Sequence, residues 1–299
     1  MDAPSRTTLR RQVWTAAPSE ALLPYVRAFI AQAIDVPPGE TATLTIAATV
    51  YPVLSVTYAG TVRVDRHEDG RAPVPEVSLT GPIPFAFRST MGGRPRGFFV
   101  QFEPAGPLAL LGVEGASYRA GPSARHLVRP DAADRLDAWG QAVAAAGDEA
   151  DAFADRVRLT ERLFSDLLAT DSLAPARERA ARTARLAGHV LETDGTRRVR
   201  DVADHLGVSE STLQRRFRTD LGVMPKPFSA IVRFRHALAY LHAHPGTSWA
   251  RVADRFGYAD QSHLIRDYKR FAGVVPSRWD DAERFIDLTF GILEEGSAD

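Results

Sequence analysis

The sequence predicts an α+β protein with a β-rich N-terminal domain, flanking helices and an all-α C-terminal domain. The chain of 299 residues suits two domains. Short β-prone runs separated by glycine and proline clusters fill residues 41–113, and helical periodicity replaces them after Pro130. The expected division is a β-rich domain with trailing helices over 1–170, a linker over 171–181, a helical domain over 182–280 and an acidic tail over 281–299.

Composition excludes several classes of protein. The chain is 44% hydrophobic and 25% charged, as in globular proteins, and it has no cysteine. A disulfide scaffold, a cysteine metal site and thiol chemistry are therefore excluded. No apolar run typical of a secretory signal follows Met1–Trp14. Residues 41–62 are uncharged and long enough to span a membrane, but six threonines and Pro52 favour buried strands. We expect a cytoplasmic protein that does not contact a membrane.

The N-terminal elements follow in order. Apolar residues spaced by three and four predict a helix over residues 19–33. Three β-prone runs then predict the strands of a small sandwich or barrel: 43–46, 53–58 and 97–102. Residues 131–146 and 151–168 are predicted helices, because each has helical periodicity and an acidic residue in its first turn. Polar and proline residues over 169–175 indicate the start of the linker.

Charge is distributed unevenly, although Lys and Arg balance Asp and Glu over the whole chain. Residues 181–280 contain 17 basic and 10 acidic residues, whereas residues 1–180 contain 19 and 21. The tail over 281–299 contains 1 basic and 6 acidic residues. A basic helical domain joined to a neutral remainder is typical of a DNA-binding module attached to a second function.

An internal repeat organises the helical domain. Residues 202–225 recur as residues 252–276, and the copies begin 50 and end 51 positions apart. The second copy therefore has one extra residue in its turn. Because two copies in register accompany polar outer faces and a basic surplus, a purely structural helical repeat is the weaker interpretation.

Each copy of the repeat predicts a helix-turn-helix unit. A short helix ends at Gly207 or at Gly257, where glycine adopts a left-handed backbone at little cost. Ser209 or Asp260 follows as the N-cap of the next helix. Small alanines on the first helix of each copy allow the two helices to approach closely.

The second helix of each copy has one apolar and one polar face. Leu213 with Phe217, and Leu264 with Tyr268, are expected to be buried. The opposite faces carry polar side chains: Ser211, Gln214, Arg215 and Arg218, then Gln261, Ser262, Arg266 and Lys269. Gln pairs with adenine and Arg with guanine in the major groove. The two helices are therefore predicted to recognise DNA.

One amphipathic helix is expected between the copies, over residues 226–242, and His244-Pro245-Gly246 stops it. A rigid connecting helix would fix the spacing of the two recognition helices. Two such helices on one face of DNA should meet major grooves about one helical turn apart, roughly 34 Å.

Further residues of this region form a specific signature: Gly207-Val208-Ser209, Leu213, Arg215, Phe217, Gly222, Arg235, 237–241, Gly257-Tyr258 and Phe271-Ala272-Gly273-Val274-Val275-Pro276. Through them, residues 182–279 resemble the double helix-turn-helix domain of AraC-family transcription regulators. The resemblance implies that bases are read by Ser211, Gln214, Arg215, Gln261, Ser262, Ile265 and Arg266. We expect phosphate contacts from Ser209, Thr212, Arg216, Arg218, His263, Lys269 and Arg270.

The same resemblance implies an N-terminal β-rich domain, often cupin-like, that binds an effector or dimerises the protein. Residues 100–113 resemble a sensor-like domain with no assigned ligand. The effector-binding candidates are Tyr51, Tyr58, Phe87, Arg88 and Phe99. Residues 1–180 contain only His67 and His126, too few for a cupin metal site. We therefore expect no metal, no cofactor and no catalytic residue.

Three hypotheses remain open from the sequence. The first is a DNA-binding transcription regulator that senses a small molecule or dimerises through residues 1–170. The second is an enzyme with a cupin-like N-terminal domain and an accessory DNA-binding module. The third is a DNA-binding dimer that needs no ligand. The expected partners are double-stranded DNA, a small-molecule effector, a second copy in a homodimer and, for an activator, RNA polymerase.

Overall fold

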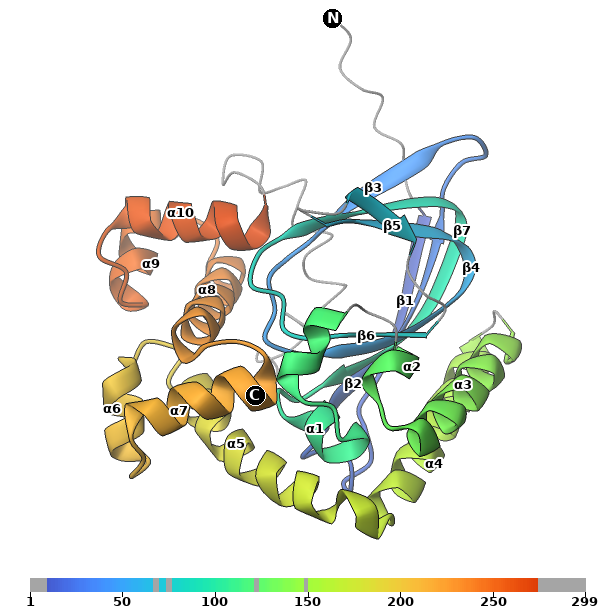
Figure 1. The fold of residues 1–299 in the computed structure, drawn as a ribbon. Coiled ribbons are helices and arrows are strands. Elements are labelled where there is room, and N and C mark those ends of the chain that lie inside the picture. Colours follow the sequence, from blue (N-terminus) through green and yellow to red (C-terminus); the bar gives the residue numbers. More distant parts are fainter. Residues whose placement is uncertain (1–9, 67–69, 74–76, 121–123, 148–149, 274–299) are drawn as a thin grey trace, which may run out of the picture.

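The computed structural model describes residues 10–66, 70–73, 77–120, 124–147 and 150–273 (Figure 1). Its N-terminal half is one curved antiparallel sheet with helices packed against it, and its C-terminal part is helical. This confirms the predicted fold class. The tail over 281–299, and the end of the second repeat from residue 274, lie outside the described residues.

Seven strands form the sheet: β1 (Arg10–Ala16), β2 (Val26–Asp35), β3 (Thr41–Ile46), β4 (Val53–Arg66), β5 (Gly70–Pro73), β6 (Val77–Thr80) and β7 (Phe87–Phe102). Their order is β1-β2-β7-β4-β5, with β3 also on β7 and β6 on β4. The long β7 pairs with β3 along its first half and with β2 along its second. Register shifts in the β4–β7 pairing surround Gly60, whose φ is 71°, and such bulges bend strands.

The helix predicted over residues 19–33 is wrong. Residues 19–25 form a turn, and residues 26–35 are strand β2. β2 lies between β1 and β7, and six consecutive residues, 29–34, are buried. A strand covered on both faces has a continuous apolar run, and periodicity does not distinguish such a run from a buried helix.

Five helical segments follow the sheet: α1 (Gly106–Leu111), the 3-10 helix η1 (Gly115–Ala120), α2 (Ala124–Leu127), α3 (Pro130–Ala145) and α4 (Ala150–Leu168). The last two confirm the predicted helices over 131–146 and 151–168. They pack on one face of the sheet, where Phe98 meets Trp139 and Phe102 meets Phe164 at ring-centroid distances of 6.4 and 5.7 Å. In the described part of the chain, no helix combines the length and apolar character needed to cross a bilayer.

The C-terminal elements are η2 (Asp171–Leu173), α5 (Ala174–Glu192), α6 (Val199–His205), α7 (Glu210–Arg216), the π-helical turn η3 (Phe217–Leu221), α8 (Pro225–Ala243), α9 (Trp249–Arg255) and α10 (Gln261–Ala272). Residues 171–181, which the sequence predicts to be a linker, form η2 and the first turns of α5. Pro175 lies in the first turn of α5, where proline starts a helix instead of breaking it.

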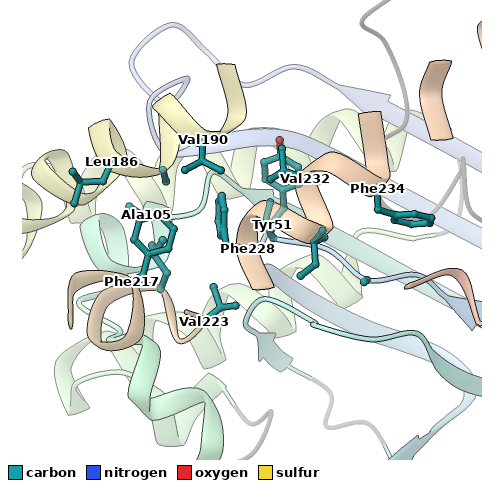
Figure 2. Close-up of a cluster of buried hydrophobic side chains, with 14 of the residues drawn as sticks. Tyr51, Ala105, Leu186, Val190, Phe217, Val223, Phe228, Val232 and Phe234 are labelled. Atoms are coloured by element: carbon teal, nitrogen blue, oxygen red, sulfur yellow. The ribbon is translucent and has the colours of Figure 1, made fainter. Parts of the chain in front are cut away.

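One buried cluster joins the two halves of the chain. Figure 2 shows Tyr51 and Ala105 of the N-terminal half beside Val190 of α5, Phe217 of η3 and Phe228 of α8. Tyr51 is 7% exposed, and both phenylalanines are fully buried. The helical region is therefore packed against the sheet region through a shared core.

Candidate nucleic-acid interface

The first helix-turn-helix unit consists of α6, a turn and α7. Gly207 has a φ of 64°, as the predicted left-handed turn requires. The hydroxyl oxygen of Ser209 accepts a hydrogen bond from the amide of Thr212 at 3.2 Å, which confirms the predicted N-cap of α7. Ala203 is fully buried, as is Leu213. This unit has the turn chemistry that the sequence predicts.

The second unit, formed by α9 and α10, repeats the same construction. Gly257 has a φ of 66°, and the Asp260 carboxylate accepts a hydrogen bond from the His263 amide at 2.7 Å. Ala253 is 2% and Leu264 is 1% exposed. The extra residue of this copy therefore leaves the glycine turn and the acidic N-cap intact.

Helix α8 supports both units. Phe217 after α7 meets Phe228 of α8 edge to face, with ring centroids 5.2 Å apart. Tyr268 of α10 meets Phe234 of α8 in the same way at 5.9 Å. These contacts confirm the buried faces of the recognition helices, and α8 confirms the connecting helix predicted over 226–242. His244 ends it.

Removing either N-cap should lower stability by a similar, modest amount. We expect Asp260→Ala and Ser209→Ala each to reduce the free energy of unfolding by about 1 kcal/mol, because one amide hydrogen bond of a recognition helix is lost. Urea unfolding of the full chain measures this. Asp254→Ala is the control, since that exposed side chain caps no helix. An unchanged midpoint for both variants would contradict the capping role.

The predicted base-reading residues lie on the outward faces of α7 and α10. Ile265 is partly buried. The others are exposed: Ser211, Gln214, Arg215, Gln261, Ser262 and Arg266. Of the predicted phosphate contacts, four are exposed and three are partly buried. The exposed ones are Ser209, Arg218, Lys269 and Arg270, and the partly buried ones are Thr212, Arg216 and His263. Their contacts with DNA stay predictions.

Several of these side chains already have partners within the protein, among them Ser209 and His263. Ser209 also donates its hydroxyl hydrogen to Thr212 Oγ1 at 2.9 Å, besides capping α7. The His263 ring meets Tyr258 edge to face, with centroids 5.1 Å apart. Burial raises the pKa of Tyr258 to about 12, and the nearby Arg233 charge only partly offsets this rise. Tyr258 is therefore neutral at physiological pH and provides an apolar support for His263.

An ion-pair network around the buried Asp220 lies at the end of the first recognition helix. Asp220 of η3 is 4% exposed, and its carboxylate accepts hydrogen bonds from Arg179 Nε at 2.7 Å and Thr183 Oγ1 at 2.5 Å. Arg179 also donates to Glu114 at 2.5 Å. Burial alone would lower the pKa of Arg179, but its bonds to Glu114 and Asp220 raise the pKa above its ordinary value.

Sequence reasoning missed this network and the arginines of α5 beside it. Arg179 falls in the segment expected as a linker, and Arg182 stands at the first position of the predicted helical domain. The available signal was their spacing of three residues, which puts both on one side of a helix. Nothing in the sequence alone places that side against η3.

The C-terminal end of α10 is anchored by loops of the sheet domain. The amide of Ala86 donates to the carbonyl of Arg270 at 3.0 Å, and the amide of Ala48 donates to the carbonyl of Phe271 at 2.8 Å. The last carbonyls of a helix lack partners within the helix, so these bonds satisfy them. The N-terminal half is therefore hydrogen-bonded directly to the second recognition helix.

The five effector-binding candidates occupy separate places. Tyr51 lies in the shared core, with the guanidinium carbons of Arg27 and Arg235 at 4.6 and 5.6 Å from its ring centre. Tyr58 packs beneath the buried Arg156 of α4 at 4.4 Å, on the sheet face that also carries Phe98.

The other three candidates lie elsewhere on β7. Phe99 follows Phe98 in the strand and so points to the opposite face. Arg88 is exposed, and Phe87 packs against the small cluster around Leu44. The structure does not bring the five together, and their effector role stays a prediction.

A comparison with known protein families matches the C-terminal region. The model of a family described as a helix-turn-helix domain matches residues 202–282. No curated protein matches the chain. Among solved structures, ToxT from Vibrio cholerae is 12% identical, with a TM-score of 0.43, over 92% of this chain and 98% of its own.

Two further solved structures are matched. ToxT from Vibrio cholerae strain SCE256, solved with a bound unsaturated fatty acid, is 12% identical, with a TM-score of 0.42, over 98% of this chain and 100% of its own. The AraC-like transcriptional activator CuxR is 15% identical, with a TM-score of 0.23, over 76% of this chain and 86% of its own.

Proposed function

We propose that this chain, which carries an AraC-type helix-turn-helix domain at its C-terminus, is a sequence-specific DNA-binding transcription regulator. The observation that carries the proposal is the pair of capped helices α7 and α10 on the common support α8. Their exposed faces are polar, and they belong to the segment of the chain with a surplus of basic residues. We also propose that this regulator works in the cytoplasm.

Contacts with phosphates and contacts with bases have different roles in DNA binding. Arginine and lysine side chains near the ends of α7 and α10 bind backbone phosphates, and the counterions released make binding strongly dependent on salt. Glutamine and arginine side chains on the outward faces read base edges. With α8 fixing their separation, the two helices enter major grooves about one turn apart, roughly 34 Å.

The N-terminal half is proposed to control the second recognition helix. The two amide bonds to the end of α10 and the shared core support this role, since a change in the sheet loops alters the partners of α10 directly. We expect the control to come from a small-molecule effector or from dimerisation through residues 1–170. An effector that binds the folded state raises the melting temperature of the full chain. A thermal-shift screen without any stabilising compound would favour the ligand-free dimer.

The test of DNA binding is a selection from genomic fragments with the full chain, followed by binding curves on the enriched site. We expect one tightly bound motif with specified bases in two segments about one helical turn apart. Affinity should fall as salt rises. The ratio of specific to non-specific affinity should fall less steeply than the affinity itself. Absence of any enriched motif, with and without stabilising compounds, would contradict the proposed function.

Single recognition residues should change both affinity and base preference. We expect Gln214→Ala or Arg266→Ala to weaken binding to the selected site by about 1–3 kcal/mol and to relax one base position. Competition binding against site variants measures this. Arg158→Gln on α4 is the control, because it removes an exposed charge remote from the repeat. An equal loss on random DNA would count against base reading by these residues.

A further inference from the structure

A pocket of about 250 Å³ lies where α5 crosses the end of the first recognition helix. Its lining comes from three elements, α5, α7 and η3: Arg179, Arg182, Arg215, Arg216, Thr219 and Asp220. Four arginines therefore face a single carboxylate. Such a concentration of positive charge favours the binding of an anion.

The carboxylate does not neutralise the pocket. Asp220 is buried, and its two oxygens are occupied by Arg179 and Thr183. Arg179 is in turn bound by both Asp220 and Glu114, so its positive charge is balanced within the protein. The network thus fixes the wall of the pocket and leaves the positive charge to the other three arginines.

Those three arginines have little internal compensation. Arg182 lies 3.7 Å from Glu178 of its own helix, in a pair whose side chains are 45% and 75% exposed and therefore weakly coupled. Among the residues that the structure describes, Arg215 and Arg216 form no ion pair. Guanidinium groups present N–H donors in a planar fork that matches phosphate oxygens. The pocket is accordingly suited to a phosphate group.

We propose that this pocket binds a phosphate group, held by Arg182 of α5 together with Arg215 and Arg216 of α7. The source of the phosphate rests on the proposed function: if the chain binds DNA through α7, a pocket beside α7 would receive a phosphate of the DNA backbone. Helix α5 then extends the DNA contact beyond the repeat. Arg215, predicted as a base reader, serves here as a phosphate ligand. A free phosphorylated molecule has the same recognition chemistry.

The first arm of the test measures DNA binding by the full chain, as wild type, Arg182→Gln and the control Arg158→Gln. Both arginines are exposed, so the variants should fold, and circular dichroism verifies this. Arg182→Gln should weaken binding to the selected site and to random DNA by the same factor, about five-fold near 0.15 M salt. The slope of log affinity against log salt should fall by about 0.9. The control should match the wild type.

The second arm omits DNA and measures melting temperatures in inorganic phosphate and in pyrophosphate, against chloride of equal ionic strength. If the pocket takes a free phosphate, both anions stabilise the wild type and Arg158→Gln more than Arg182→Gln. Either this result or the uniform loss in the DNA arm supports the phosphate site and identifies its source. Identical behaviour of Arg182→Gln and Arg158→Gln in both arms overturns it. If the wild type prefers no DNA sequence, the proposed function is contradicted but the phosphate site is not. Binding to random DNA and the melting temperatures still test the pocket.

Discussion

Gly115→Ala is expected to lower the free energy of unfolding by about 3 kcal/mol, because the added methyl group has no room. A Cβ atom at Gly115 of η1 would overlap the backbone of Leu221, the last residue of η3, and of Gly222, which follows it. Both sides of this contact are main chain, so no side chain can rotate away. The φ of Gly115 is not positive, and the cost therefore comes from the contact alone.

Gly188→Ala is the matched control for this prediction. Gly188 lies inside α5, and nothing comes within 4 Å of a Cβ atom placed there. Alanine should stabilise that helix by about 0.5–1 kcal/mol. Urea unfolding of both variants gives opposite signs if η1 and η3 touch as described. Equal stability of Gly115→Ala and wild type would show that this contact between the halves is open in solution.

The effect of Gly115→Ala bears on regulation as well as stability. The η1–η3 contact holds the first recognition unit, and the loop amides of Ala48 and Ala86 hold the second. Each unit is therefore attached to the N-terminal half at a separate point. A variant that opens one point should change the relative placement of α7 and α10, and binding to the two-segment site should weaken more than binding to either segment alone.

Local chemistry explains how much of the helical domain could be predicted. Gly207 and Gly257 mark turns because glycine alone enters the left-handed region cheaply, and Ser209 and Asp260 cap helices through their own backbone neighbours. These interactions join residues that are close in the sequence, so a sequence pattern can reveal them. The polar and apolar faces of α7 and α10 follow from helical periodicity in the same way.

The remainder depends on contacts between distant segments. Strand β2 is covered on both faces, so apolar residues occur along it without the alternation of a half-buried strand, and their spacing also fits a helix. Only the complete sheet determines that both faces are covered. The anchoring of α10 uses main-chain amides of Ala48 and Ala86, and any residue type except proline provides such a donor. The arginine pocket forms because α5 packs against η3 beside the end of α7, and the residue spacing within one helix does not reveal such packing.

Asp220→Ala is expected to lower the free energy of unfolding by about 2–3 kcal/mol, because the buried Thr183 hydroxyl loses its acceptor and the partly exposed Arg179 loses one of its two carboxylate partners. Asp220 is 4% exposed and accepts from both Arg179 and Thr183. Without it, Arg179 retains only Glu114, and the Thr183 hydroxyl, on a fully buried residue, loses its acceptor. Urea unfolding measures the loss, and Asp204→Ala is the control because its pair with Arg200 is exposed.

A double-mutant cycle separates the ion pair from the packing around it. Arg179→Met alone should also destabilise the chain, since it leaves the Asp220 charge buried with one fewer donor. Combining it with Asp220→Ala should cost less than the two single losses together, because no unpaired charge is then buried. Additive losses would mean that Arg179 and Asp220 act independently. In that case the network would not be what holds α5 against the end of α7, and the position of the pocket arginines would have to come from the surrounding apolar core.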